Sequence, residues 1–413
     1  MFSRPDTPAG GAPRRRRRAL AALLAGMLAL PAAQAAPGCA AASWPLWERF
    51  AQRFMQADGR VIDYSVSQQH STSEGQSYAM FFALVAHDRA RFDKLWSWSV
   101  ANLAGGDIGA RLPAWQWGKK TDGSWGVVDP NPASDANLWF VYALAEAGRL
   151  WSEPRYTQAA RTLLAQVAEK EVADLPGLGP TLLPAPSGFV LKERIWRLNP
   201  SYLPVPLVRA LERLDPQGPW KAVAASHARM LAETTPHGFA ADWVAWEVPE
   251  GGGKGAFVTD PEKGDIGSYD AIRTYLWAGM TPRADPLAPL LRQQLSGMAT
   301  ALQSVPLPPE RVRTASGEVE GAAPVGFSAA LLPYLQSLGL SSALEAQRQR
   351  VRTLLLEAPP ETPARYYDQV LGLFGTGYME QRYQFLPTGR VQLRWEKACP
   401  SQKSQNAAAT DRH

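Results

Sequence analysis

The sequence predicts an all-α fold, and two observations support this prediction. Apolar residues along most of the chain recur at helical spacing and not in strict alternation. The sequence shows no alternation of strands with helices, so a parallel sheet is not expected. Many helices around one hydrophobic interior favour an α/α toroid, and an irregular helical bundle fits the same pattern.

Each expected helix is a segment with an apolar stripe of helical period. The segments lie near 44–57, 74–87, 91–103, 136–150, 154–170, 203–213, 220–233, 269–279, 285–303, 326–337, 341–356 and 363–375. Pro- and Gly-rich connections separate them, for example 175–180 and 251–255. Residues 383–395 alternate around Pro387-Thr388-Gly389, which predicts a C-terminal β-hairpin.

The first 35 residues have the features of a secretory signal peptide. The basic run 14–18 precedes an apolar stretch, and Ala33-Gln34-Ala35 fits the small-residue cleavage pattern. The apolar stretch is shorter than the roughly 20 residues of a transmembrane helix. We therefore expect a protein that acts in the periplasm or is secreted. Gly38-Cys39 leaves a lipoprotein signal open, and the paired arginines leave twin-arginine export open.

Removal of this signal leaves a chain without net charge. Residues 1–35 hold six of the 43 Lys and Arg and one of the 38 Asp and Glu, so 37 of each remain. A neutral chain suits an uncharged ligand and does not indicate a nucleic-acid partner.

The residues after the signal are expected to form one domain. No linker divides 36–399, and a polar tail follows at 400–413. Cys39 and Cys399 lie at the two ends of this domain, and in an oxidising compartment such a pair indicates a disulfide. Two free thiols are the alternative. We expect a monomer.

Several common catalytic patterns do not occur in the sequence. The five histidines show no metal-ligand spacing, and no Gly-x-Ser-x-Gly elbow occurs. The glycine-rich stretch 251–255 lacks the Ser or Thr of a phosphate-binding loop and is better explained as a mobile loop tip. We therefore expect neither a metal nor a cofactor.

Three acidic residues lie at the starts of predicted helices. Glu74 follows Ser73, which with Gln76 forms a capping-box pattern, and Asp135 and Asp270 precede apolar runs. Taken singly, each acid is explained by helix capping or by the helix dipole. In a toroid, however, helix starts can gather at one rim. Glycosidic hydrolysis needs two carboxyl groups, one protonated and one ionised.

The aromatic residues favour a sugar ligand. The chain has 15 tryptophans, and several are clustered. Tryptophan offers a large flat surface that fits the apolar face of a pyranose, although most tryptophans in a protein of this kind are core residues. Trp115-Gln116-Trp117-Gly118-Lys119 follows Pro113 and is interpreted as a loop, so we expect a sugar platform there.

Four segments together resemble the family 8 glycoside hydrolases and occur in the family's order: 72–78 (TSEGQSY), 113–118 (PAWQWG), 133–135 (ASD) and 268–273 (SYDAIR). Within the family, agreement is closest with the periplasmic endoglucanases of bacterial cellulose synthase operons. It extends from about Trp44 to Trp395 and includes 60–63 (RVID), 199–204 (NPSYLP) and 324–330 (PVGFSAA).

The resemblance implies an (α/α)6 barrel that hydrolyses internal β-1,4-glucosidic bonds with inversion. Glu74 is implied as general acid, Asp270 as the base that activates water, and Asp135 as the residue that orients the sugar. The implied partners are cellulose chains and, functionally, the cellulose synthase complex. The implied substrate-binding residues are Trp115, Trp117, Tyr202, Tyr269 and Arg273.

One departure from the family pattern and one electrostatic conflict need a structural answer. The family usually has a second Asp two positions after Asp135, where this chain has Asn137. A helix start should also lower the pKa of Glu74, whereas a general acid must hold its proton. Burial or the charge of Asp135 must therefore outweigh the dipole.

A polysaccharide lyase and a non-catalytic glucan-binding protein are the alternative functions.

Overall fold

Six helices that are buried on nearly every side form the inner ring of the molecule. The computed structural model describes residues 43–359, 362 and 365–398, and all of them belong to one compact unit. In the ring, each helix contacts the next in this order: α2 (Ser73–Val85), α4 (Ser134–Leu150), α6 (Val205–Leu214), α8 (Ala271–Met280), α11 (Val325–Leu338) and α13 (Tyr366–Met379). Phe374 of α13 packs on Tyr78 and Phe82 of α2, at centroid distances of 5.2 and 4.6 Å, and closes the ring.

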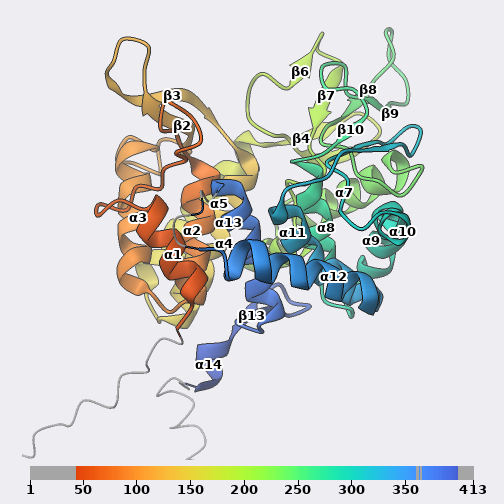
Figure 1. The fold of residues 1–413 in the computed structure, drawn as a ribbon. Helices are drawn as coiled ribbons and strands as arrows, with labels where there is room; N and C mark the ends of the chain where they lie inside the picture. The colour runs from red at the N-terminus through yellow and green to blue at the C-terminus, as the bar shows by residue number, and fades with distance from the viewer. Residues whose placement is uncertain (1–42, 360–361, 363–364, 399–413) are drawn as a thin grey trace, which may run out of the picture. The chain divides into compact units, whose positions relative to one another are not determined.

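An outer layer of helices covers this ring (Figure 1). These helices carry an apolar stripe on one face and polar residues on the other, as expected for helices that cover a core. The contacts pair α1 with α13, α3 with α2, α5 with α4, α7 with α6, α9 with α7 and α8, and α12 with α11. Their bounds are α1 Pro45–Phe54, α3 Arg89–Asn102, α5 Pro154–Lys170, α7 Trp220–Thr234, α9 Ala288–Gln294, α10 Ser296–Ser304 and α12 Ser341–Val351.

Most predicted helices are present within a few residues of their expected bounds. The helix expected at 285–303 is instead two helices, because the helical conformation is interrupted at Leu295, between α9 and α10. The segment expected at 341–356 ends in one π-helical stretch, Arg352–Leu356. Among the described residues, no helix is both long enough and apolar enough to cross a bilayer.

Small antiparallel sheets precede several inner helices. β1 (Ser71–Thr72) leads into α2, β3 (Trp125–Pro132) into α4 and β10 (Ile266–Gly267) into α8. In Figure 1, β2 and β3 lie at the upper left and β4 and β6 to β10 at the upper right of the molecule. The sequence predicted only the C-terminal hairpin. The other strands are β2 Ala114–Lys119, β4 Val172–Leu175, β5 Gly179–Leu182, β6 Val190–Leu191, β7 Ile195–Leu198, β8 Val244–Glu247, β9 Ala256–Thr259, β11 Arg311–Arg313 and β12 Val319–Glu320.

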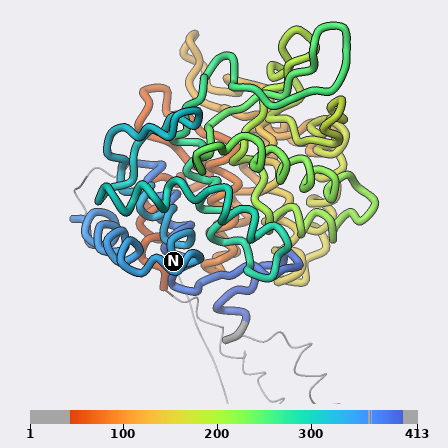
Figure 2. The backbone as a smooth tube through the Cα atoms, turned by 90° about the vertical axis from the view of Figure 1, so that its right-hand side faces the viewer, coloured from red at the N-terminus to blue at the C-terminus, as the bar shows by residue number. Residues whose placement is uncertain are grey.

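The predicted C-terminal hairpin is confirmed and lies at the opposite end of the barrel (Figures 1 and 2). β13 (Tyr383–Phe385) pairs with β14 (Val391–Leu393), and the short helix α14 (Arg394–Ala398) follows. The hydroxyl of Tyr142, on α4, donates to the carbonyl of Gly389 in the hairpin turn at 2.8 Å. The hairpin therefore covers the ring at the end away from the β1, β3 and β10 connections.

Candidate active site

Glu74 lies in the first turn of α2, directly after a strand. Thr72 is the N-cap of this helix, and its hydroxyl accepts a hydrogen bond from the Gly75 amide at 3.1 Å. The expected capping box from Ser73 to Gln76 is therefore wrong. The buried Gln76 side chain instead accepts from the Val61 amide at 2.6 Å and donates to the Gly59 carbonyl at 3.1 Å. The Val61 amide and the Gly59 carbonyl are buried, so each needs a hydrogen-bond partner within the protein, and Gln76 supplies it.

The carboxyl group of Glu74 is held by two donors. Oε1 accepts from the indole N–H of Trp115 at 3.0 Å, and Oε2 accepts from the Ser73 hydroxyl at 3.2 Å. Trp115 reaches Glu74 because β2 pairs with β1, with Gln116 opposite Thr72. The expectation that 115–119 is a loop is wrong. The strand has partners on both edges, β1 and β3, and these distant pairings override its weak local signal.

Asp135 is the second residue of α4 and is almost fully buried. Ala133 is the N-cap, so the alternative of Asp135 as N-cap does not apply. Oδ1 of Asp135 accepts from the Ala136 amide at 2.8 Å. Oδ2 accepts no hydrogen bond from any described residue. An unsatisfied buried carboxylate oxygen is costly in a structural role and is typical of a ligand site.

Asp270 lies immediately before α8 and is more open, with 32% of its side chain exposed. Oδ1 accepts from the Arg273 guanidinium at 2.9 Å. Oδ2 accepts from the indole N–H of Trp243 at 3.1 Å. The carboxylate is thus held at both oxygens and still reaches solvent, as a base that activates water requires.

Arg273 connects the second and third acids. Its Nη2 lies 2.9 Å from Asp270 Oδ1 and 3.8 Å from Asp135 Oδ2, and it donates to the Ser201 hydroxyl at 2.9 Å. The three predicted carboxyl groups thus lie at one end of the barrel, each at the start of an inner helix. This arrangement is the one that the sequence analysis expected of a toroid.

The electrostatics of the site assign different protonation states to two of the acids. Burial, and then the charge of Asp135, raise the pKa of Glu74 to about 8 against the helix backbone and Arg273. Burial raises the pKa of Asp135 to about 6, and Arg273 opposes this shift. Near neutral pH, Glu74 therefore holds its proton while Asp135 is mostly ionised. This split resolves the conflict between the helix dipole and a general acid.

The comparisons with known proteins agree with this geometry. The model of glycosyl hydrolases family 8 matches residues 20–381. The chain belongs to this family. An endoglucanase of Xanthomonas axonopodis pv. citri is 50% identical over 92% of this chain and 97% of the relative. An endoglucanase of Escherichia coli K12 is 44% identical over 87% and 94%. The crystal structure of an endo-1,4-D-glucanase from Vibrio fischeri is 38% identical, with a TM-score of 0.76 over 86% of this chain and 99% of that chain.

Family 8 membership and the paired inner and outer helices establish the fold as an (α/α)6 barrel. The toroid prediction is therefore confirmed, and the irregular bundle is not what forms. The roles of Glu74, Asp135 and Asp270 stay predictions that the geometry supports. Cys39, Cys399, the signal at 1–35 and the tail at 400–413 lie outside the described residues.

The predicted substrate-binding residues of this family 8 enzyme occupy different positions around the carboxyl groups. Trp115 is exposed and contacts the Glu74 carboxyl, whereas Trp117 is partly buried between Trp98 and Trp125, at centroid distances of 5.5 Å to each. Arg60 lies 4.3 Å from the Trp117 ring centroid. Trp117 therefore supports the platform, and the exposed ring beside it is Trp125.

The remaining three predicted residues are Arg273, Tyr202 and Tyr269. Arg273 binds Asp270 directly, and the Tyr202 ring lies 5.9 Å from the Arg273 guanidinium carbon. Tyr269 is exposed, and its hydroxyl donates to Glu310 at 2.8 Å. Of these three residues, Arg273 therefore contacts a predicted catalytic carboxylate directly, and Tyr202 lies against Arg273.

Several residues of the site were not predicted from the sequence. Trp125, Trp243 and Asp242 come from loops and strands that the helical period does not mark. Tyr78 is one turn beyond Glu74 in the matched segment, and its buried hydroxyl has no hydrogen-bond partner among the described residues. The i, i+4 spacing of Glu74 and Tyr78 on one helix face was the available signal.

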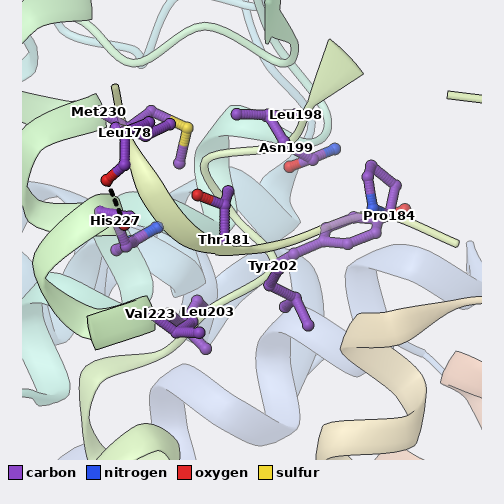
Figure 3. Close-up of a pocket in the computed structure, with 12 residues that line it drawn as sticks. Leu178, Thr181, Pro184, Leu198, Asn199, Tyr202, Leu203, Val223, His227 and Met230 are labelled. Carbon is purple, nitrogen blue, oxygen red and sulfur yellow. Dashed lines mark hydrogen bonds between the residues drawn. The ribbon is translucent and has the colours of Figure 1, made fainter. Parts of the chain in front are cut away.

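A separate, mostly apolar pocket has Tyr202 as one of its lining residues (Figure 3). None of the three predicted catalytic carboxyl groups lines it. Burial lowers the pKa of its His227 to about 4, so this imidazole is neutral. The pocket therefore lacks the charge of the carboxyl cluster. Within the part of the chain that the structure describes, no group of three or more His, Cys, Asp or Glu has the geometry of a metal site.

Proposed function

We propose that this family 8 enzyme is an endo-1,4-β-glucanase that inverts the anomeric configuration. The observation that carries the proposal is the pair of differently held acids, a protonated Glu74 beside an exposed tryptophan and a solvent-accessible Asp270 fixed by Arg273. The relatives named above, called endoglucanases, support the choice of β-1,4-glucan.

In the proposed reaction, Glu74 gives its proton to the glycosidic oxygen as the C1–O bond breaks. A water attacks C1 from the opposite face, and Asp270 takes the proton that this water loses. Both carboxyl groups return to their starting states by exchange with solvent. No covalent bond forms between sugar and protein, so Asp135 acts by binding and distorting the sugar with its free Oδ2.

The test is hydrolysis of carboxymethylcellulose, followed by new reducing ends, viscosity and ultraviolet absorbance. We expect reducing ends to appear together with an early fall in viscosity, because internal bonds are cut. Glu74→Gln keeps the shape of the side chain and removes the transferable proton, so the rate should fall by about 10²–10⁴. Glu345→Gln, at an exposed ion pair with Arg348, is the matched control and should retain full activity.

Other outcomes would contradict the proposal. An ultraviolet-absorbing product without inversion would indicate a polysaccharide lyase. Binding of glucan without any new reducing ends would indicate a non-catalytic glucan-binding protein. Wild-type turnover by a correctly folded Glu74→Gln variant would show that another group is the acid.

We also propose that the chain is exported and acts in the periplasm or outside the cell as a monomer. The basic run at 14–18, the apolar stretch after it and the small residues at 33–35 support export. The mature protein should begin near Ala36 and carry a Cys39–Cys399 disulfide. Mass spectrometry with and without reduction tests both points, and two cysteines alkylated without reductant would contradict the disulfide.

The proposed cellular role is the trimming of nascent glucan during cellulose biosynthesis, in functional association with the cellulose synthase complex. Its support is the resemblance of the segments 60–63, 199–204 and 324–330 to the endoglucanases of cellulose synthase operons. A deletion strain should secrete altered amounts of cellulose, and the wild-type gene but not Glu74→Gln should restore them. Equal restoration by both would contradict a catalytic role in this process.

A further inference from the structure

Asp242 and Trp243 lie next to each other before β8 and both contact Asp270. The Asp242 amide donates to the Ile266 carbonyl at 2.8 Å, so this segment runs beside β10, which leads into α8. Sequence analysis assigned no role to either residue. Their separation from Asp270 by 27 or 28 positions hides the contact from any local pattern.

One oxygen of Asp242 accepts three backbone hydrogen bonds at the start of α8. Oδ1 accepts from the amides of Ser268 at 2.7 Å, Asp270 at 3.0 Å and Ala271 at 2.7 Å. Helix α8 has no side-chain cap from its own N-cap residue, which is Asp270 itself. Asp242 therefore satisfies the free amides of this helix start from a distant segment, so neither Asp270 oxygen is needed to cap the helix.

Trp243 fixes the side chain of Asp270 while Asp242 fixes its backbone. The Trp243 indole N–H donates to Asp270 Oδ2 at 3.1 Å. Its ring is stacked on Phe189, with an interplanar angle of 4°, and lies 5.2 Å from the Arg197 guanidinium carbon. Arg197 is in turn paired with the buried Asp260 at 2.7 Å. The indole that donates to Asp270 is thus held in place by stacking on Phe189 and by the ion-paired Arg197.

We propose that Asp242 is a positioning residue that sets the place of the Asp270 carboxylate through the first turn of α8. The inference rests on the proposed function, in which Asp270 is the base. Burial, and then the charge of Asp270, raise the pKa of Asp242 to about 6, while the three amides oppose the shift. Placing a second carboxyl beside the base is unfavourable, and the three amide donors offset that repulsion. Near neutral pH, Asp242 is mostly a carboxylate, the stronger acceptor for these amides.

The test compares Asp242→Ala with Asp242→Asn in steady-state kinetics on soluble cello-oligosaccharide. Displacement of a catalytic group by about 1 Å costs on the order of 10²-fold in rate. We expect Asp242→Ala to lower kcat by about 10–100-fold with KM changed by less than about twofold. Asp242→Asn keeps a carbonyl oxygen that accepts the amides, so most of kcat should return.

Asp88→Ala is the matched control for loss of a helix start. Asp88 is the N-cap of α3 and accepts from the Arg91 amide at 3.0 Å, near the end of α2 that is far from Glu74. This variant should lose stability and keep its kcat. If Asp242→Ala does not fold, Trp243→Phe keeps the stacked ring, removes the donor to Asp270 and should lower kcat by about tenfold.

A double variant separates action through Asp270 from an independent effect. In the Asp270→Ala background, Asp242→Ala should cause no further loss of residual turnover, because the residue that it positions is gone. Wild-type kcat in folded Asp242→Ala, a change in KM alone, or equal loss in the Ala and Asn variants would overturn the inference. A wild-type chain without glucanase activity would contradict the proposed function itself.

Discussion

At the scale of single residues, Glu74 shows how a helix start can hold a proton. The free amides of the first turn favour a carboxylate, and burial with a nearby Asp135 charge disfavours it. Burial and the Asp135 charge together outweigh the effect of the amides, so the pKa of Glu74 rises to about 8. The sequence located the residue and named Asp135 as the second charge, but the balance depends on burial that only the assembled barrel creates.

This balance predicts a pH dependence. A raised carboxyl pKa means that the acid is protonated below about 8 and loses its proton above it, so kcat/KM should fall on the alkaline side of that value. In Asp135→Asn the repelling charge is gone, and the pKa of Glu74 should be lower. Carboxyl ¹³C NMR titration of both proteins measures it, and an unchanged Glu74 titration would contradict the coupling.

Asn137, the departure from the family pattern, is paired with a buried acid. Its side-chain amide donates to Glu171 Oε1 at 2.9 Å, and both side chains are buried. Burial is the main cause that raises the pKa of Glu171 to about 8. An amide at 137 avoids a third carboxyl between Glu171 and Asp135. The sequence showed the substitution, and only the structure shows its partner.

Glu171 should make stability depend on pH. Its folded-state pKa lies above the unfolded value near 4.5, so the native state holds the extra proton between about 4.5 and 8. The free energy of unfolding therefore falls as pH rises through this range. Glu171→Gln keeps the Asn137 bond without a titrating group, so its Tm should exceed that of the wild type at pH 9 and match it near pH 4.5.

The control for this prediction is Glu169→Gln, an exposed position in the last turn of α5, the helix whose C-cap is Glu171. Thermal melts of the three proteins at both pH values suffice. Parallel pH dependence of Tm in the wild type and Glu171→Gln would contradict a buried, protonated Glu171.

At the scale of elements, the helices were predictable and the small strands were not. The outer helices carry local apolar stripes and the inner helices carry longer apolar runs, and α5 matches its expected bounds, 154–170. β1 is two residues long, and its pairing with β2 joins positions more than 40 residues apart. Such strands depend on tertiary partners, so local patterning does not mark them.

Packing between α11 and α13 predicts a strict requirement for glycine. A Cβ atom at Gly375 would lie 1.9 Å from the Ala329 carbonyl oxygen, and backbone cannot move aside as a flexible side chain does. Gly375→Ala should therefore lower the free energy of unfolding by about 1–3 kcal/mol or more. Gly126→Ala is the control, because its Cβ would meet only the end of Lys120. Denaturant unfolding of both variants measures the difference, and equal stability would contradict the close helix contact.

At the scale of the whole molecule, the ring of inner helices turns three separate helix starts into one site. Positions 74, 135 and 270 are far apart in sequence, and each acid lies at the start of a different inner helix. The barrel places α2, α4 and α8 so that Arg273 spans two of the acids and Asp135 repels the third. The toroid expected from the helical periods predicted this gathering, and the resemblance to family 8 assigned the roles of the three acids. The contacts of Asp242 and Trp243 with Asp270 and the exposed ring of Trp125 could not be predicted, because these residues come from the strands and loops that connect the helices.

In the proposed mechanism, Glu74 and Asp270 act from opposite faces of the sugar, with the attacking water on the Asp270 side. Proton NMR of the first product formed from a cello-oligosaccharide, recorded before mutarotation, tests it directly. We expect the α-anomer to appear first and Asp270→Asn to abolish this turnover in a folded protein. Initial release of the β-anomer, or a glycosyl adduct on Asp135, would contradict it.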